Sequence, residues 1–460
     1  MQPHQHLVII GNGIAGITLA QQVRKKSQCA ITIISVESKL HFSRTALMYV
    51  YMGHMRYQDI VPYADWYYQE QQLNTIQDRV IGIDFKNKTL RLEKEAAISY
   101  DILVLAVGSS PAFHDWPGIS SKGVQGLVSL QDLELMEQQS AHTKQAVIVG
   151  GGLIGIEMAE MLRSRGVEVT MLVRDSLFWK SNLPSEEAKL ITDHIQHSGI
   201  NLILNDELEE VIADSSGQVS AVRTRNGVTL PCQFVGVAIG VKPNITFVKS
   251  TDLETDTGII VDQYFRTNIE HVYAIGDCAQ FQPNHKGASK LEQLWYTGRQ
   301  HGEALASILT GNLVPYERGP WFNSAKFLDI EFQTYGVVPP VADDEKYVSF
   351  YWQHPDGTKS IRILFDKMSE KLVGINLLGI RYRHELCHHW LKNNYTIHQV
   401  MQELLATNFD AEFFKRFEPE LLKQYLSVYP DKMLMKEKIT WWSIREKFRL
   451  YRTPTKTSNT

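Results

Sequence analysis

Two glycine-rich motifs constrain the fold of this chain more than any other feature of its sequence. Each has the form GxGxxG, at residues 11–16 and 150–155, and each stands between a short apolar run and a helical pattern. A strand, a tight turn, a helix and a second strand form the βαβ unit of a parallel sheet. Because the two units are too far apart for a solenoid repeat, they predict two Rossmann-like dinucleotide-binding domains.

The glycines of the first motif stand where a dinucleotide site needs them. The first permits the tight turn, the second lets a pyrophosphate approach, and the third lets the helix pack on the sheet. The helix N-terminus offers free N–H groups to the phosphates. Glu37, about 20 residues after the motif, stands where a carboxylate can hold ribose hydroxyls. The predicted contacts are Gly11, Gly13, Ile14, Ala15, Gly16 and Glu37.

The second motif has no acid at the equivalent strand end. Val173 and Arg174 stand there, and Lys180 follows. A missing carboxylate removes repulsion from a 2′-phosphate, and nearby cations attract one. We therefore expect NADPH to be somewhat favoured over NADH, although the adjacent Asp175 argues against this. The predicted nucleotide contacts are Gly150, Gly152, Leu153, Ile154, Gly155, Arg174, Lys180 and Gly240.

The composition is that of an ordinary globular chain. Of its 460 residues 43% are hydrophobic, and the net charge of −4 gives no basic field to attract nucleic acid. We find no stretch of about 18 apolar residues and no signal-peptide pattern, so we expect a cytoplasmic protein. The cysteines form no CxxC pair, which argues against a disulfide framework or a cysteine-only zinc site. They are Cys29, Cys232, Cys278 and Cys387.

Two dinucleotide folds indicate two cofactors, most simply a resident flavin and a transient nicotinamide. Beyond the two motifs, AVGSSP (106–111), HVYAIGDCAQ (271–280) and LEQLWYTGRQHG (291–302) resemble segments of the two-dinucleotide-domain flavoprotein reductases. That family includes glutathione-reductase-like enzymes, NADH oxidases, nitrite reductase large subunits, and rubredoxin and ferredoxin reductases. The resemblance implies FAD contacts at Arg44, Ala106, Gly108, Gly276, Asp277, Glu292 and Trp295, with Asp277 on the ribityl chain. It also implies that Glu157 lies near the nicotinamide.

Departures from this family leave the electron acceptor open. Thr45 occupies the place of the redox cysteine of the thiol-using members. Tyr49 replaces a lysine of the ferredoxin-reductase branch, and Asn323 replaces its tryptophan over the flavin. Lys326 is a candidate for the flavin pyrimidine edge, although a surface lysine is the simpler interpretation. Without the thiol, we expect electrons to leave directly from the reduced flavin.

The predicted architecture is α/β. An FAD domain (1–112 and 244–318) is interrupted by an NAD(P)H domain (113–243), and a C-terminal α+β domain (319–430) and a basic aromatic tail (431–460) follow. The expected activity is that of an FAD-dependent NAD(P)H oxidoreductase with a small iron–sulfur protein as electron acceptor. A membrane-surface quinone reductase, an NADH oxidase and a non-catalytic NAD(P)H-binding scaffold stay open as alternatives. A monomer and a homodimer are both compatible with the sequence.

Two C-terminal features carry alternatives of their own. HELCH at 384–388 places two histidines on one helix face, as in zinc sites, but no further ligand is evident and we expect no metal. Residues 436–452 combine cations with tryptophans. A helix packed on its own domain is the simpler interpretation, and docking to an acidic protein partner or a membrane surface is the alternative.

Overall fold

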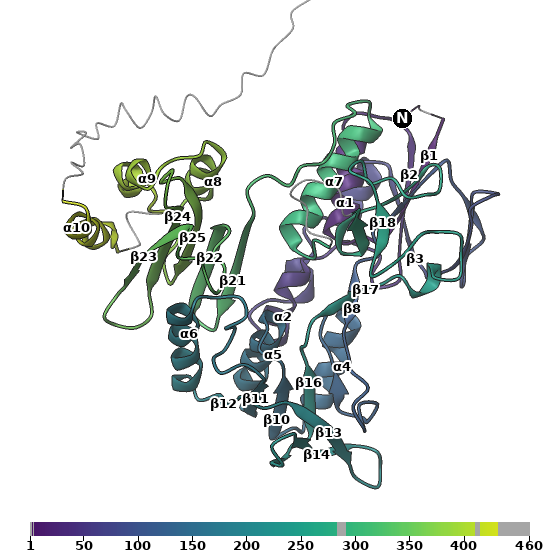
Figure 1. The fold of residues 1–460 in the computed structure, drawn as a ribbon. Coiled ribbons are helices and arrows are strands. Elements are labelled where there is room, and N and C mark those ends of the chain that lie inside the picture. Colours follow the sequence, from purple (N-terminus) through teal and green to yellow (C-terminus); the bar gives the residue numbers. More distant parts are fainter. Residues whose placement is uncertain (1, 3, 283–290, 410–414, 431–460) are drawn as a thin grey trace, which may run out of the picture.

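The computed structural model describes residues 2, 4–282, 291–409 and 415–430. The predicted tail at 431–460 lies outside these residues. Figure 1 shows three groups of elements, one at the upper right, one below it and one at the upper left. Within the described ranges, no helix has the length and apolar character needed to cross a membrane.

The first group is built on a parallel five-stranded sheet. Its strands and the two helices packed together beside them are β1 (His6–Ile10), β2 (Ala30–Ser35), β3 (Leu73–Gln77), β7 (Ile102–Leu105), β19 (Val272–Ala274), α1 (Ile14–Arg24) and α7 (Trp295–Leu309). The strand order is β19-β7-β1-β2-β3. β1 and β7 are buried along almost their whole length, as expected for central parallel strands. Because β19 and α7 come from far along the chain, this unit is discontinuous.

The second group is a further parallel five-stranded sheet, in the order β12-β11-β10-β16-β9. Its elements are β9 (Val124–Gln125), β10 (Gln145–Val149), β11 (Glu168–Val173), β12 (Asn201–Leu204), β16 (Phe234–Val237), α4 (Leu130–Ser140), α5 (Leu153–Ser164) and α6 (Ser185–His197). The two parallel sheets, each with a glycine turn after a central strand, confirm the prediction of two Rossmann-like folds.

Two short antiparallel strands connect these sheets. β8 (Ser109–Pro111) follows the first sheet, β17 (Val241–Pro243) follows the second, and the two pair side by side. The chain therefore leaves and re-enters the first unit through one two-stranded ribbon. The exact boundaries, 112/113 and 243/244, stay a prediction.

The third group is an antiparallel sheet with helices over one face, which confirms the α+β prediction. Its elements are β21 (Phe322–Phe327), β22 (Ile330–Gly336), β23 (Tyr347–Gln353), β24 (Ser360–Asp366), β25 (Leu372–Leu378), α8 (His384–Lys392), α9 (Ile397–Glu403) and α10 (Glu418–Val428). The strand order is β21-β22-β25-β24-β23. Trp390 and Tyr425 of the helices pack into the core formed with the sheet.

The remaining elements are short. They are α2 (Leu47–Tyr51), α3 (Asp65–Glu70), β4 (Val80–Asp84), β5 (Thr89–Leu92), β6 (Ile98–Ser99), β13 (Leu208–Ala213), β14 (Val219–Thr224), β15 (Thr229–Pro231), β18 (Ile259–Val261), β20 (Ala279–Phe281), and the 3-10 turns η1 (Arg44–Ala46), η2 (Tyr57–Ile60), η3 (Thr246–Val248), η4 (Gly276–Cys278) and η5 (Leu404–Ala406).

A buried ion pair joins the second and third groups. Arg362 of β24 donates from Nε to Glu187 Oε2 at 3.0 Å and from Nη2 to Glu186 Oε2 at 2.9 Å, both on α6. Arg362 also donates to Ser349 Oγ at 2.6 Å and lies over the ring of Tyr351. Glu187 has no exposed surface, and burial raises its pKa to about 7, while the charge of Arg362 and its hydrogen bond oppose that rise. Glu187 therefore depends on Arg362 to stay ionised.

We expect Arg362→Met to lower the free energy of unfolding by about 3–5 kcal/mol, because it leaves the buried carboxylate of Glu187 uncompensated. The double variant Arg362→Met with Glu187→Leu should recover most of this loss. Chemical denaturation measures both effects. Lys189→Met, which breaks an exposed pair with Asp193 on the same helix, is the control and should cost less than about 1 kcal/mol. Equal losses in the single and double variants would contradict the assignment.

Candidate functional site

The turn between β1 and α1 forms a first cradle, defined here as residues 11–16 with the N-terminus of α1. Gly11 has φ +114°, and a Cβ there would lie 2.0 Å from the carbonyl oxygen of Ala106. A Cβ on Gly16 would lie 2.0 Å from the oxygen of Gly11. At Gly13, by contrast, a Cβ would meet no atom within 4 Å, and no side chain caps the helix. The space in front of the free backbone N–H groups at the N-terminus of α1 is therefore open, as the binding of a pyrophosphate requires.

The turn between β10 and α5 repeats this geometry as a second cradle, defined as residues 150–155 with the N-terminus of α5. Gly150 has φ +119°, and its Cβ would lie 2.4 Å from the oxygen of Ala238. A Cβ on Gly155 would lie 2.6 Å from the oxygen of Gly150. Gly152 is open by comparison, and no side chain caps α5. Both cradles therefore fit a dinucleotide.

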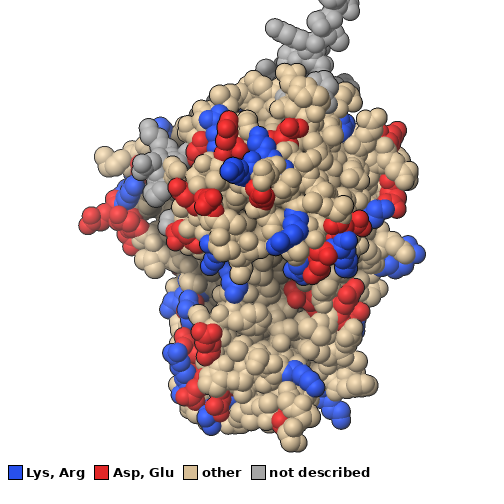
Figure 2. All heavy atoms as spheres, turned by 90° about the vertical axis from the view of Figure 1, so that its right-hand side faces the viewer, with Lys and Arg blue, Asp and Glu red and all other residues tan. Residues whose placement is uncertain are grey.

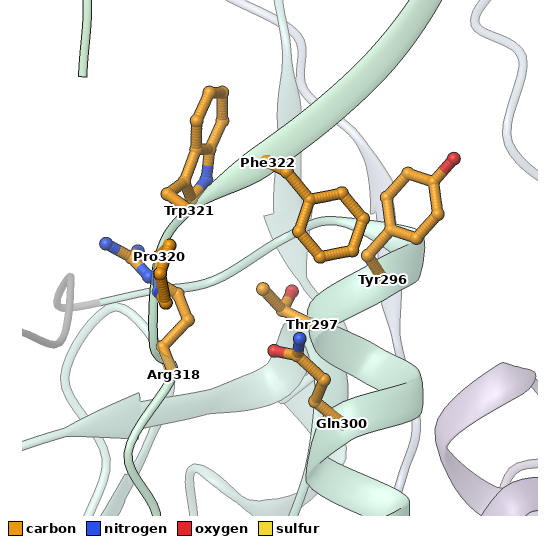
Figure 3. A pocket seen from close by; sticks show the side chains of 7 residues that line it. All are labelled: Tyr296, Thr297, Gln300, Arg318, Pro320, Trp321 and Phe322. Carbon is orange, nitrogen blue, oxygen red and sulfur yellow. The ribbon is translucent and has the colours of Figure 1, made fainter. Parts of the chain in front are cut away.

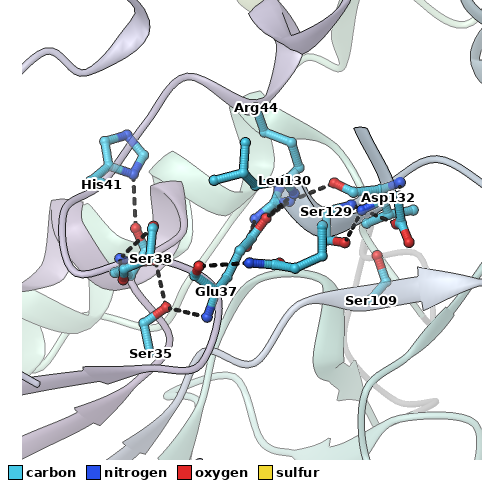
Figure 4. A network of polar contacts seen from close by, with 12 residues as sticks. Ser35, Glu37, Ser38, His41, Arg44, Ser109, Ser129, Leu130 and Asp132 are labelled. Carbon is cyan, nitrogen blue, oxygen red and sulfur yellow. Dashed lines mark hydrogen bonds and ion pairs between the residues drawn. The ribbon is translucent and has the colours of Figure 1, made fainter. Parts of the chain in front are cut away.

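The carboxylate of Glu37 lies at the end of β2, where a ribose-binding acid is expected. Arg44 donates to both of its oxygens, Nη1 to Oε1 at 2.8 Å and Nη2 to Oε2 at 2.6 Å. The amide of Leu130, the first residue of α4, donates to Oε1 at 2.8 Å (Figure 4). Oε1 thus accepts two hydrogen bonds and Oε2 only one, so Glu37 is held in place while Oε2 can still accept from a hydroxyl.

A second polar network, also in Figure 4, supports the first cradle from behind. Asn12 donates from Nδ2 to the backbone oxygen of Ser38 at 2.7 Å and accepts from the hydroxyl of Ser35 at 3.1 Å. His41 Nδ1 lies 2.8 Å from the backbone oxygen of Asn12. Burial lowers the pKa of His41. These residues were not predicted from the sequence, although Asn12, a polar side chain inside a buried glycine motif, was a signal for them.

Asp277 stands at the end of β19, beside the first cradle. Its Oδ2 accepts a hydrogen bond of 2.8 Å from the hydroxyl of Ser109. Burial raises the pKa of this carboxyl, and the bond from Ser109 opposes that rise. Gly276, just before it, has φ +72° and donates its amide to His301 Nδ1 at 3.1 Å. A half-buried acid with one oxygen engaged by Ser109 is suited to bind a polyol hydroxyl with the other.

Glu292 lies in the interior and not on an open face of the cradle. Its Oε2 is 3.1 Å from His301 Nε2 and accepts from the hydroxyl of Tyr316 at 2.9 Å, while Arg318 donates to Oε1 at 3.3 Å. Because His301 accepts at Nδ1 from Gly276, its Nε2 carries the hydrogen bonded to Glu292. The structure thus places Glu292 behind the Asp277 segment as its support. Trp295 begins α7, with 36% of its surface exposed.

The other predicted cofactor residues lie around the two cradles. Ala106 follows β7, and its carbonyl packs against Gly11. Gly108 has φ +65° in the turn between β7 and β8. Gly240 has φ +123° in the turn between β16 and β17. Arg174 is exposed just after β11, and Lys180 donates to the hydroxyl of Ser176 at 2.9 Å.

Glu157 and Lys326, the candidates for a direct part in the reaction, lie on different elements, α5 and β21. Glu157 lies in the first turns of α5, and burial, with the charge of Glu160, raises its pKa to about 7. Lys326 of β21 donates to Glu160 Oε1 at 3.0 Å. The structure therefore brings Lys326 to the helix that carries Glu157 rather than leaving it free.

No described cysteine is placed to relay electrons. All four are buried, and Thr45 is exposed in η1. Cys278 donates to the backbone oxygen of Leu105, and burial raises its pKa to about 12. Burial also raises the pKa of Cys232 to about 12. A thiol with so high a pKa is almost entirely protonated near neutrality and is a poor nucleophile.

Two hollows lie between α7 and the C-terminal group. In Figure 3, Tyr296 and Phe322 stand with their rings together, 4.6 Å between centroids, beside Thr297 and Gln300. A neighbouring groove of about 630 Å³ is lined by residues of α7 and α8, among them His384 and His388. The two imidazoles are 5.8 Å apart. Among the described residues, no group of three or more histidine, cysteine or acidic side chains is arranged to hold a metal ion.

The family model for pyridine nucleotide-disulphide oxidoreductases matches residues 5–302, which include both cradles. The chain belongs to this family. It is 31% identical over 282 residues to the nitrite reductase [NAD(P)H] of Bacillus subtilis, covering 60% of this chain and 34% of that protein. It is 33% identical over 283 residues to the rubredoxin-NAD(+) reductase of Acinetobacter baylyi, covering 60% of this chain and 72% of that protein.

A solved ferredoxin reductase from Rhodopseudomonas palustris is 28% identical, with a TM-score of 0.74 and coverage of 82% of this chain and 91% of that one. The chain spans 34% and 48% of the length of two Bacillus subtilis relatives, the nitrite reductase and an assimilatory nitrate reductase electron transfer subunit. These likenesses confirm the predicted family and fold. FAD and NAD(P)H are the cofactors of the family, as predicted, and the open fronts of both cradles suit them.

We expect a reductive titration of the FAD-loaded protein to consume about two electrons per flavin, because no thiol pair stores a further two. Stoichiometric dithionite under anaerobic conditions, followed by visible absorbance, measures this. Cys278→Ser is the matched variant and should leave the number unchanged. A count of about four that falls to about two in Cys278→Ser would contradict the assignment.

We expect Asp277→Ala to weaken FAD retention by roughly ten-fold or more, because a partly buried charged hydrogen-bond acceptor is lost. Equilibrium dialysis with flavin fluorescence measures the dissociation constant. Asp115→Ala is the control, because Asp115 is exposed and outside the predicted cofactor contacts. Equal FAD affinities in the two variants would exclude Asp277 from the site.

Proposed function

We propose that this protein is an FAD-dependent NAD(P)H oxidoreductase that delivers electrons to a small iron–sulfur carrier. The observation that carries the proposal is the presence of two open dinucleotide cradles in a chain whose cysteines are all buried. When bound, FAD supplies the conversion between two-electron and one-electron chemistry. The family membership and the likeness to rubredoxin and ferredoxin reductases support this assignment.

The protein's own residues would bind and orient the two nucleotides. The first cradle, Glu37 and Asp277 would hold FAD at its pyrophosphate, ribose and ribityl parts. The second cradle would hold the pyrophosphate of NAD(P)H at the N-terminus of α5, which places Glu157 on the same helix as the bound nucleotide. Arg174 would select the 2′-phosphate of NADPH.

The buried cysteines favour direct transfer from the flavin over the thiol-dependent alternatives. A disulfide reductase or a thiol-dependent peroxidase needs an accessible thiolate, and Thr45 supplies none. Nucleic acid is a poor candidate partner, because positive and negative side chains are interspersed on the face shown in Figure 2 and the net charge is −4. Docking of an acceptor through residues 431–460 stays a prediction, since these residues lie outside the described ranges.

We expect the FAD-loaded protein to reduce an iron–sulfur carrier, tested with a rubredoxin and a [2Fe–2S] ferredoxin, at least roughly ten-fold faster than oxygen, a quinone or oxidised glutathione, within ordinary enzyme rates. Stopped-flow absorbance of each acceptor, with NADH and NADPH in parallel, measures this. Ferricyanide is the control for a flavin that turns over. Fast reduction of oxygen or a quinone alone would favour the oxidase or quinone-reductase alternatives, and flavin that NAD(P)H does not reduce would favour the scaffold.

A further inference from the structure

Glu157 is a partly buried acid without a cation of its own. It lies on α5 next to the second cradle, and no hydrogen bond or ion pair to its carboxylate is found among the described residues. Burial, followed by the negative charge of Glu160, raises its pKa to about 7. A carboxyl in this condition gains or loses its proton near neutral pH, so small changes in nearby charge decide its state.

The nearest source of such a change is an ion pair that reaches α5 from another part of the fold. Glu160 stands three positions after Glu157 and therefore on the same helix face. Lys326 Nζ donates to Glu160 Oε1 at 3.0 Å, and β21, which carries Lys326, lies against α5. The side chains of Glu160 and Lys326 are 21% and 36% exposed, so water screens the pair only in part.

Other titratable groups on the elements packed against α5 face elsewhere. In α2, Tyr51 bonds to Ser140 of α4 and Tyr49 stacks on His54. Glu168 starts β11, at the end of the strand away from the cradle.

On α5 itself, Arg163 lies beside Gly199. Among the described residues, the charge that acts directly on Glu157 is that of Glu160, and Lys326 is paired with Glu160.

We propose that Lys326 is a positioning residue for the second cradle, which controls through Glu160 whether Glu157 carries a charge. The inference rests on the proposed function, because it takes the second cradle to be the NAD(P)H site. With Lys326 in place, the repulsion of Glu157 by Glu160 is partly cancelled, and Glu157 can change its charge near neutral pH. Protonated Glu157 can donate a hydrogen bond from its carboxyl, whereas ionised Glu157 adds a negative charge beside the second cradle.

The signs of the expected effects differ between the two partners. Lys326→Met leaves Glu160 uncompensated, which stabilises the protonated form of Glu157 and moves its titration to higher pH. Glu160→Gln removes the repulsion and moves the titration to lower pH. Each shift should be about half a pH unit or more at this partial exposure. The double variant should lie between the two single variants, and Lys326→Arg should restore the wild-type value.

The experiment uses the FAD-loaded full chain and two readouts. Infrared difference spectroscopy follows the protonated carboxyl band that Glu157→Gln abolishes, as a function of pH and without nucleotide. Stopped-flow reduction of the flavin by NADH and by NADPH gives the pH profile of the rate and separates it from the apparent affinity. If Lys326 had a purely structural role, Lys326→Met would change the stability of the protein. The pH midpoints of the infrared titration and of the reduction rate would then stay unchanged.

Opposite shifts of the infrared midpoint in Lys326→Met and Glu160→Gln support the proposal. Shifts in the same direction, or no shift in folded Glu160→Gln, overturn it, and Glu160→Gln gives this answer even if Lys326→Met fails to fold. If the infrared midpoints move as expected but NAD(P)H reduces no flavin, the proposed function fails while the control of Glu157 stands. If the flavin is reduced and the midpoints do not move, only the role of Lys326 fails.

Discussion

Backbone packed directly on backbone holds the nucleotide-binding half of this fold together. At Gly11 and Gly16 the main chain approaches so closely that a single added methyl group would overlap a carbonyl oxygen. The same helix meets α7 at Gly302, where a Cβ would lie 2.6 Å from the carbonyl oxygen of Ala15. These contacts fix the direction of α1, and with it the N–H groups that face a phosphate. A side chain at any of these positions would displace the helix and remove the cradle.

The sequence predicted the features that depend on local bonds. Both cradles, the acid at Glu37 and the alternation of strands and helices follow from residues close together in the chain, whose spacing is visible without a structure. Asp277 could be placed because its segment as a whole resembles a known motif. Arg362 and Lys326 belong to a different class of residue, whose partners are remote in sequence.

What the sequence could not predict is which distant side chains meet. Arg362 and Glu187 are 175 positions apart, and Lys326 and Glu160 are 166 apart. Nothing in either local pattern marks one as the partner of the other, because the meeting depends on how the C-terminal sheet lies on α5 and α6. Glu292 shows the same limit: its motif did not indicate the three side chains from other positions that surround it in the interior.

The paired crossings β8 and β17 have a mechanical consequence. Two strands bonded edge to edge are held together by backbone hydrogen bonds, which oppose the sliding of one strand along the other. A displacement of β8 along its own direction therefore also moves β17. The two connections between the parallel sheets therefore act as a single link, and the packing of α2 on α4 and α5 further restrains one sheet relative to the other.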